Sequence, residues 1–461
     1  MTGHTIEQQR AEHFAYLCKI MPEMVGRLSW SRAQIEAYQT KALRELLQHA
    51  KAHSSWYRAR LSHLDAATAT LADLAKIPSM NKNDLMEHWD AIVTVPGASL
   101  REAEAKLRSM TDQFYIWEDH VLFASGGTGG RPGIFVYDWD GLAQNWAGMC
   151  RSIPQYVASL PLPGAPAPQP VRLVAVGAEI SAHGSFVVGK VFTDPHNPVI
   201  RLSGWRSAEE LVPKLNAAQP EFLVCYPSLI PALAAAAKAG ELKMSPRVLV
   251  CGGEHFSMKS QQLAREAWPT AEVLFCWGTS EGGGTFPCPL GDGFHICEDQ
   301  VIMEPVDATD APIAAGQHSA GLYFTNLYNK AQPIFRYYID DVFEMAEGPC
   351  ACGSVYRKVR QVHGREFEKF KYGSITVHPV ALQLAVLEQP RVLEYQIRQT
   401  ERGAHLSYQS KGEVDTQRLR SRMYEALRSY GLAEPVVTVE QVAILERTAA
   451  GKLKRFVPLV R

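Results

Sequence analysis

The stretch Phe222-Leu-Val-Cys225, followed by Leu229-Ile-Pro-Ala-Leu-Ala-Ala-Ala-Ala-Lys-Ala239 and then Val248-Leu-Val250, decides the fold class. Two short apolar runs flank an alanine-rich segment whose length and composition are typical of a helix. Strand, helix and strand in this order form the repeating unit of a parallel sheet covered by helices. The stretch therefore predicts an α/β fold.

The alternation extends in both directions along the chain. Other β-type runs are Val121–Ala124, Ile134–Tyr137, Val171–Val176 and Val273–Phe275, and helical stretches cover Ala208–Ala218 and Met258–Ala267. Nearer the N-terminus, Ser31 and Gln34 form a capping box that predicts the start of an amphipathic helix. We predict a large N-terminal domain, residues 1–363, built of layered sheets and helices.

The pattern of strand-like and helical segments changes near Gly364. Runs at Val392–Ile397, His405–Tyr408 and Val436–Ile444 flank a helical segment from Asp415 to Tyr430. This pattern predicts a small α+β C-terminal domain, residues 364–461.

Composition excludes several classes of protein. The chain has 461 residues, and its 46% of hydrophobic residues argue against a disordered chain. Its formal charge of −1 argues against a nucleic-acid binder that relies on overall positive charge. Nine cysteines are too few for a disulfide scaffold of this length. No apolar run reaches the ~20 residues of a membrane-spanning helix. The start, Met1 to Phe14, is polar and lacks the centre of a signal peptide. We expect a cytoplasmic protein without a nucleic-acid or membrane partner.

A glycine-rich segment, Ser125-Gly-Gly-Thr-Gly-Gly-Arg-Pro132, can let backbone N–H groups approach an anion closely. It lacks the Lys-Ser/Thr pair of a Walker loop. Both flanks look like strands, whereas a dinucleotide fingerprint is followed by a helix. From these residues alone, a phosphate loop and a plain glycine-rich hairpin turn both remain open.

Further motifs follow in order. They are Cys251-Gly-Gly-Glu-His255, Trp277-Gly-Thr-Ser-Glu281, Gly293-Phe-His-Ile-Cys-Glu-Asp299, Arg336-Tyr-Tyr-Ile-Asp-Asp341, Gly364-Arg365 and Gly451-Lys452. Together with the glycine-rich loop, they resemble the signatures of the phenylacetate–CoA ligase group of adenylate-forming enzymes. The resemblance implies ATP-dependent activation of a carboxylic acid, most typically an aromatic one, to an acyl-adenylate with release of pyrophosphate and then transfer to CoA.

The resemblance also assigns roles to residues. Those implied to bind ATP are Ser125, Gly126, Gly127, Thr128, Gly129, Gly130, Arg131, Gly252, Gly253, Glu254, Trp277, Gly278, Thr279, Ser280 and Asp341. Glu281 would offer an oxygen to Mg²⁺, and Lys452 and Arg365 would act with it in catalysis. The pocket for the acid would include His183, Phe186, Tyr226 and Ser228, although an ordinary core histidine remains an alternative for His183.

Two departures from the family pattern concern the reaction. Arg131 stands where the loop usually has Lys, and the planar guanidinium of Arg can still bind phosphate. Phe367 stands where the hinge between the domains usually has Asp, with Glu366 and Glu368 on either side. The acceptor therefore stays open between CoA and a carrier protein, an amine or another small nucleophile, and so does the oligomeric state, a homodimer included. A nucleotide-binding module without turnover is disfavoured because Glu281, Asp341, Arg365 and Lys452 are all present.

Cys288, His295, Cys350 and Cys352 form a candidate metal set. The small residues in Cys350-Ala-Cys-Gly353 let two thiolates turn to one ion, and three Cys with one His match a structural zinc site. The alternative is that Cys288 is a buried thiol and His295 merely part of its motif.

Overall fold

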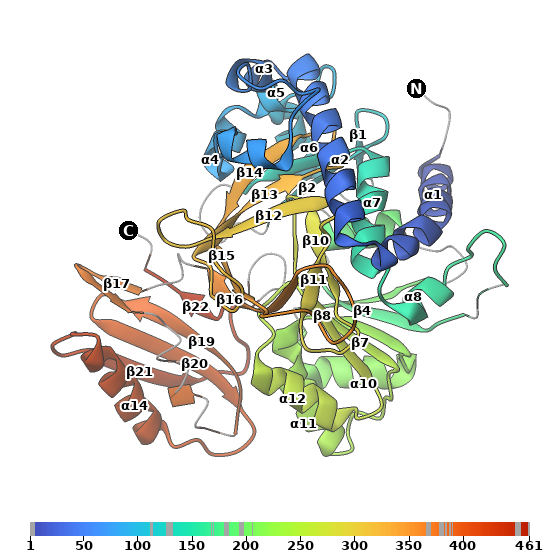
Figure 1. Cartoon of the computed structure of the whole chain (residues 1–461). Coiled ribbons are helices and arrows are strands. Elements are labelled where there is room, and N and C mark those ends of the chain that lie inside the picture. The colour runs from blue at the N-terminus through green and yellow to red at the C-terminus, as the bar shows by residue number, and fades with distance from the viewer. Residues whose placement is uncertain are drawn as a thin grey trace.

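The structure is a computed structural model that describes residues 5–110, 114–125, 132–166, 168, 170–178, 184–192, 198–204, 206–365, 370–377, 382, 385–386, 389, 391–447 and 453–459, with the backbone alone at 364 and 365. Figure 1 shows a large N-terminal part beside a smaller C-terminal part, drawn in orange and red.

A five-stranded parallel sheet with the strand order β5-β4-β6-β7-β8 lies in the lower half of the large part (Figure 1). Its strands are β4 (Leu173–Gly177), β5 (Ile200–Ser203), β6 (Phe222–Cys225), β7 (Val248–Gly252) and β8 (Glu272–Cys276). The helices between them are α9 (Gly184–Val191), α10 (Ala208–Ala218), α11 (Ile230–Lys238) and α12 (Met258–Ala267). The predicted α/β fold is confirmed, and β6, α10 and α12 have the predicted bounds.

Antiparallel sheets complete the large part. One has the order β1-β2-β3, a second β12-β13-β14 and a third β15-β16-β11-β10-β9. Their strands are β1 (Tyr115–Ile116), β2 (His120–Ala124), β3 (Ile134–Tyr137), β9 (Gly278–Thr279), β10 (Gly283–Pro287), β11 (Phe294–Ile296), β12 (Val301–Val306), β13 (Gly321–Asn326), β14 (Ile334–Ile339), β15 (Asp341–Met345) and β16 (Lys358–Arg365).

The N-terminal helices pack on these sheets. Helix α2 (Arg32–His53) begins at the predicted capping box, in which Ser31 and Gln34 bond reciprocally. Helix α1 (Ile6–Gly26) was not predicted, and it packs against α7 (Trp139–Cys150). The shorter helices are α3 (Ser55–Arg60), α4 (Lys82–Glu87), α5 (Trp89–Ile92), α6 (Leu100–Ser109) and α8 (Pro154–Ala158). Among the described residues, no helix has the length and apolar character that crossing a bilayer requires.

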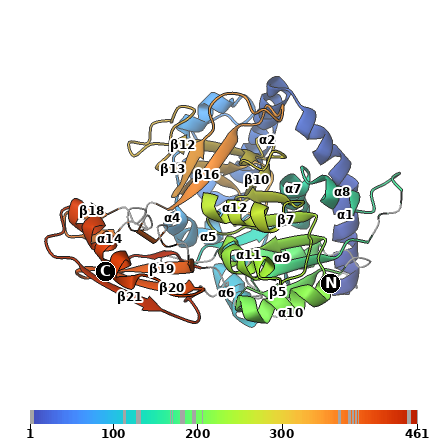
Figure 2. The ribbon, with the colours of Figure 1, turned by 90° about the horizontal axis from the view of Figure 1, so that it is seen from below.

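The C-terminal part has its own sheet, with the order β21-β20-β19-β22, and the pair β17-β18. Helix α14 (Thr416–Ser429) packs against this sheet (Figure 2). The strands are β17 (Phe370–Tyr372), β18 (Ile375–Val377), β19 (Val392–Thr400), β20 (Gly403–Ser410), β21 (Val436–Gln441) and β22 (Phe456–Val457). The buried apolar side chains from Phe370 to Phe456 form one cluster of their own, which supports the proposed division of the chain near residue 364.

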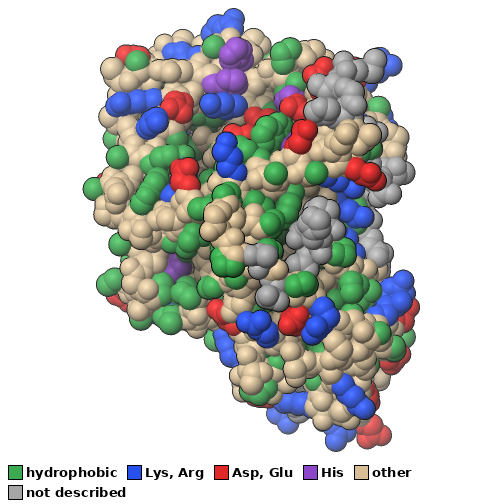
Figure 3. Space-filling model, turned by 90° about the vertical axis from the view of Figure 1, so that its right-hand side faces the viewer, with side chains coloured by type: hydrophobic (Ala, Val, Ile, Leu, Met, Phe, Trp, Pro, Cys, Tyr) green, Lys and Arg blue, Asp and Glu red, His purple; other side chains and the backbone are tan. Residues whose placement is uncertain are grey.

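Charged side chains of both signs are interspersed on the face shown in Figure 3. This distribution agrees with the near-balance of 47 Lys and Arg against 48 Asp and Glu in the whole chain.

Candidate active site

The glycine-rich segment connects two strands that pair with each other. Strands β2 and β3 pair antiparallel up to Ala124 and Ile134, as their predicted strand character required. Beyond that pair, the Ser125 N–H donates to the carbonyl of Gly133 at 2.8 Å, and the Gly133 N–H donates to Ser125 Oγ at 2.9 Å. These bonds hold Ser125 and Gly133 together, on either side of the glycine-rich segment. The predicted phosphate-binding residues Gly126, Gly127, Thr128, Gly129, Gly130 and Arg131 lie outside the described residues.

The carboxyl ends of β6 and β7 bring a second group of predicted residues together. These ends are neighbours because the two strands pair in parallel register, Cys225 opposite Cys251. Gly253 has φ +79°, a conformation that glycine adopts without strain. Beyond it, a Glu254 carboxylate oxygen accepts the backbone N–H of Ser228 at 3.0 Å. The Glu254 carboxylate thus joins the loops that follow the two strands.

Trp277 and Asp341 lie in direct contact. The indole Nε1–H donates to Asp341 Oδ2 at 3.0 Å, and the Asp341 residue is 7% exposed. This contact orients the carboxylate predicted to bind the ribose hydroxyls. It also places the aromatic ring predicted to lie near adenine beside that carboxylate.

Glu281 is buried, and its carboxylate accepts a hydrogen bond from the Thr279 hydroxyl. The Asn326 side-chain amide donates to the Glu281 carbonyl at 2.9 Å, which fixes the backbone. The Tyr137 hydroxyl donates to the Ser280 carbonyl at 2.8 Å. This last bond links β3 to the segment that carries Glu281. Strand β3, which follows the glycine-rich segment, is therefore bonded directly to the segment that carries the predicted Mg²⁺ ligand.

The predicted acid-pocket residues have different surroundings. Ser228 is buried next to Glu254, and Tyr226 is 5% exposed, with its ring against Gly204. Burial, and to a smaller extent the nearby Glu254 charge, raises the pKa of Tyr226. Phe186 on α9 is buried in an edge-on contact with Phe114. His183 lies outside the described residues.

The C-terminal part contacts the Glu254 region through Arg447 and Leu453. The Leu453 N–H donates to Glu254 Oε1 at 2.5 Å, and the Arg447 guanidinium lies 3.8 Å from the same oxygen. Arg447 also donates to Ser228 Oγ at 3.1 Å. Lys452 lies outside the described residues, but Leu453 directly follows it in the chain. Sequence analysis missed Arg447, because nothing in the spacing of residues indicates a partner almost 200 positions away.

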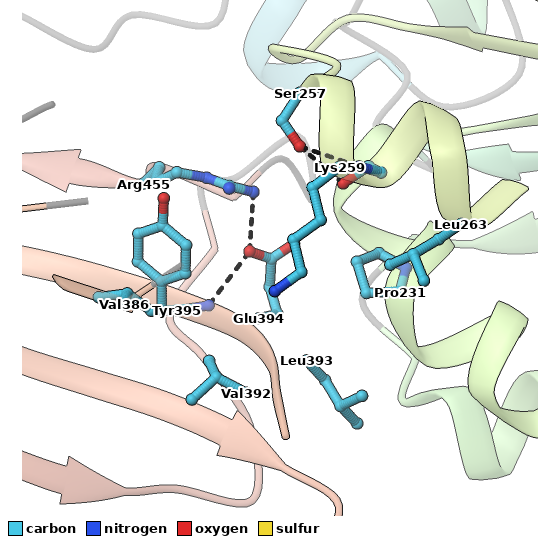
Figure 4. A pocket seen from close by; sticks show the side chains of 11 residues that line it. Pro231, Ser257, Lys259, Leu263, Val386, Val392, Leu393, Glu394, Tyr395 and Arg455 are labelled. Atoms are coloured by element: carbon cyan, nitrogen blue, oxygen red, sulfur yellow. Dashed lines mark hydrogen bonds and ion pairs between the residues drawn. The ribbon is translucent and has the colours of Figure 1, made fainter. Parts of the chain in front are cut away.

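A second contact between the two parts surrounds Glu394 on β19. Arg455 donates to Glu394 at 2.7 Å, and Lys259 of α12 extends toward the same carboxylate (Figure 4). Burial raises the pKa of Glu394 to about 7 despite the Arg455 charge. A cavity of about 30 Å³ lies between these groups and Pro231 of α11, which is room for little more than one water.

Residues near the predicted hinge are held on β16. The backbone of Arg365 pairs with Asp341 in the β15–β16 ladder. His255 Nδ1 lies 2.6 Å from the carbonyl of Val362 on β16, and burial lowers the pKa of His255 to about 4. His255 is therefore neutral near pH 7 and donates through Nδ1. Phe367, Glu366 and Glu368 lie outside the described residues.

The candidate metal ligands Cys288, His295, Cys350 and Cys352 converge. Their ligand atoms all lie within 4.8 Å of one another, with 3.3 Å between Cys352 Sγ and His295 Nε2. His295 Nδ1 lies 2.9 Å from the Tyr356 carbonyl, which directs the other ring nitrogen toward the thiols. Burial opposes ionisation of Cys350, but hydrogen bonds and the nearby Lys358 outweigh it and lower its pKa. The donor set and its spacing fit a four-coordinate zinc ion.

Comparison with known proteins gives consistent matches. No family model matches the chain. Phenylacetate–CoA ligase of Thermus thermophilus is 25% identical over 388 residues, which cover 79% of this chain and 78% of that protein. The Escherichia coli enzyme of the same name is 26% identical over 81% of this chain and 80% of its own length. These matches confirm the resemblance that the motifs predicted.

Solved structures support the fold. A crystal structure of 2-hydroxyisobutyryl-CoA ligase in the postadenylation state, in complex with 2-HIB-AMP, matches with a TM-score of 0.68 and 19% identity. The match covers 94% of this chain and 91% of that one. The same ligase in the thioesterification state matches with a TM-score of 0.57 and 20% identity. This chain therefore shares the fold of that ligase over nearly its whole length.

Proposed function

We propose that this chain, a relative of the phenylacetate–CoA ligases, is itself an ATP-dependent, AMP-forming acid–CoA ligase. The observation that carries the proposal is the convergence on Glu254. It joins the loops after β6 and β7 and also receives Leu453, which follows the predicted catalytic lysine. An enzyme that joins ATP to an acid needs a nucleotide site on the large domain and a cation delivered to the reacting atoms.

In the first half-reaction, a carboxylate oxygen of the acid forms a bond to the α-phosphorus of ATP, and pyrophosphate leaves. Asp341, oriented by Trp277, would accept hydrogen bonds from the ribose hydroxyls. Glu281 and the Thr279 hydroxyl offer hard oxygen atoms to Mg²⁺, which would offset the charge of the phosphates. Lys452 would lie between the attacking carboxylate and the α-phosphate and reduce the repulsion between the two anions.

In the second half-reaction, the thiolate of CoA attacks the acyl carbon and AMP leaves. We propose CoA as the acceptor because the curated relatives are named as CoA ligases. Transfer to a carrier protein, an amine or another small nucleophile is the alternative. Phe367 favours keeping this alternative, because it stands where the hinge between the domains usually has Asp. We propose an aromatic acid as substrate, with phenylacetate as the first compound to test.

We further propose structural Zn²⁺ at Cys288, His295, Cys350 and Cys352. The four side chains come from two segments far apart in sequence, residues 288–295 and 350–352, so an ion there would tie the β10–β11 segment to the loop before β16. A cytoplasmic location and the assembly state, including a homodimer, stay predictions from the sequence.

Two assays test the proposal. Exchange of labelled pyrophosphate into ATP, screened over aryl and alkyl acids, should depend on one class of acid. AMP release should then require CoA. Exchange without any CoA-dependent AMP release would support the alternative acceptor, and no exchange with any acid would contradict the ligase function.

A further inference from the structure

A second group of metal-ligating side chains lies where β15 and β16 meet the segment before β13, apart from the cysteine cluster. His318 precedes β13, Glu344 lies on β15 and His363 lies on β16. Their candidate ligand atoms all lie within 4.8 Å of one another. No part of the proposed ligase reaction uses these three residues.

Backbone pairing holds the three residues in place. His318 forms an isolated β-bridge with Glu344. Next to it, Ser319 and Phe343 exchange two hydrogen bonds, each 2.9 Å long, one from each backbone N–H. Glu344 lies opposite Gln361 in the β15–β16 ladder, so its side chain shares a face with that of His363, two residues further on. Because the ladder fixes these positions, little ordering entropy would be lost when an ion binds.

The side chains already face one another. His363 Nε2 lies 2.9 Å from Glu344 Oε2, and the rings of His318 and His363 lie 4.7 Å apart between centroids. A further charged group near the carboxylate is Arg360, whose Nη1 lies 3.8 Å from Glu344 Oε1. The Arg360 side chain is 60% exposed, so it can turn into solvent when a cation takes its place.

The donor set selects the kind of ion. Two imidazole nitrogens and one carboxylate oxygen suit first-row divalent metals such as Zn²⁺, whereas Mg²⁺ and Ca²⁺ prefer oxygen ligands throughout. His318 is exposed, so water can complete the coordination. Three protein ligands with water differ from the closed four-ligand set of the cysteine cluster.

We propose that His318, Glu344 and His363 form a second binding site for a transition-metal ion, with Zn²⁺ as the best-fitting candidate. The ion would join β15 and β16, which are neighbours in one sheet, to the segment that precedes β13 of another sheet. Two of these segments carry predicted active-site residues, because β15 begins with Asp341 and β16 ends with Arg365. The site would therefore stiffen the sheet from which the predicted hinge begins.

The test is a Zn²⁺ titration of the full-length protein in competition with a chromophoric chelator. In the Cys352→Ser background, which weakens the cysteine cluster, about one equivalent of Zn²⁺ should still bind. Adding His363→Gln or His318→Ala should weaken that equivalent about tenfold or more. His405→Ala is the matched control, because His405 is a partly exposed histidine with a carboxylate, that of Glu440, 3.6 Å away.

Cobalt separates the two sites by colour. Co²⁺ bound to cysteine gives an intense thiolate charge-transfer band, whereas Co²⁺ bound to two histidines and a glutamate does not. The proposal predicts weak visible bands that disappear in the His318→Ala protein. It is overturned if the Cys352→Ser protein binds no Zn²⁺, or if the His318→Ala and His405→Ala variants bind equally. His318 is exposed, so its variant tests the site even if His363→Gln fails to fold.

Discussion

Replacing Arg447 by Met should slow formation of the acyl-adenylate much more than its discharge to CoA. Arg447 belongs to the C-terminal part, and its guanidinium contacts Glu254 and Ser228 of the large part. Met keeps most of the apolar stem but removes the charge and the hydrogen bonds. The substitution therefore tests whether this contact holds the segment before Lys452 in its working position.

The expected magnitude follows from burial. The Arg447 and Glu254 side chains are 8% and 7% exposed, and breaking a buried ion pair costs about 3–5 kcal/mol. Glu254 keeps the backbone N–H groups of Ser228 and Leu453, so we expect a loss below this range, about 2 kcal/mol, in the docking of the two parts. This free energy corresponds to a roughly 30-fold lower population of the docked arrangement.

The assay measures each half-reaction separately. Pyrophosphate exchange should fall about 30-fold, whereas single-turnover discharge of preformed adenylate should change less than about threefold. Arg398→Met is the control, because Arg398 pairs with Glu446 within the C-terminal part, where the two side chains are 43% and 71% exposed. That exposed pair contributes little, so both rates should stay near wild type. Equal losses in both half-reactions, or unchanged exchange, would refute the positioning role of Arg447.

Three other predictions concern the lysine, the metal and pH. Lys452→Ala should lower adenylation by about 10²–10³-fold with little change in ATP affinity, and an equal loss from Lys454→Ala alone would reassign the role. Cys352→Ser should lower the Zn²⁺ content of the purified protein by about one ion per chain and should also lower its thermal stability, and a metal-free, fully stable wild-type protein would contradict the cysteine site. Burial lowers the pKa of His255 from 6.5 to about 4 in the folded protein. Between these two pH values, His255 is therefore protonated in the unfolded chain but neutral in the folded protein. The free energy of unfolding should therefore decrease by up to roughly 3 kcal/mol as the pH is lowered through this window. The decrease should be smaller in His255→Gln, as measured by denaturant unfolding. Parallel pH profiles for the two proteins would show that His255 does not titrate in this way.

Short-range sequence patterns explain why several helices and strands were predicted correctly. The same kind of pattern is present in helix α1, which was not predicted. Strand β3 and helix α10 match the predicted ranges because apolar runs and helix caps are short-range patterns. Helix α1 was missed although it carries the same signal as α2. Its capping box joins Thr5 and Gln8, and its buried side chains, Phe14, Leu17, Cys18 and Met21, follow a helical period.

The sequence by itself determined the fold class, the order of the motifs and the cysteine–histidine set, because each depends on residue types at short or family-typical spacing. Tertiary structure alone decided which distant residues meet. Glu254 receives Arg447 and Leu453, and Glu344 meets His318 and His363, only because strand pairing and packing between the two parts bring them together. Strand register and the packing of one part on the other are set by the summed contacts of many side chains, and no single local pattern encodes such sums.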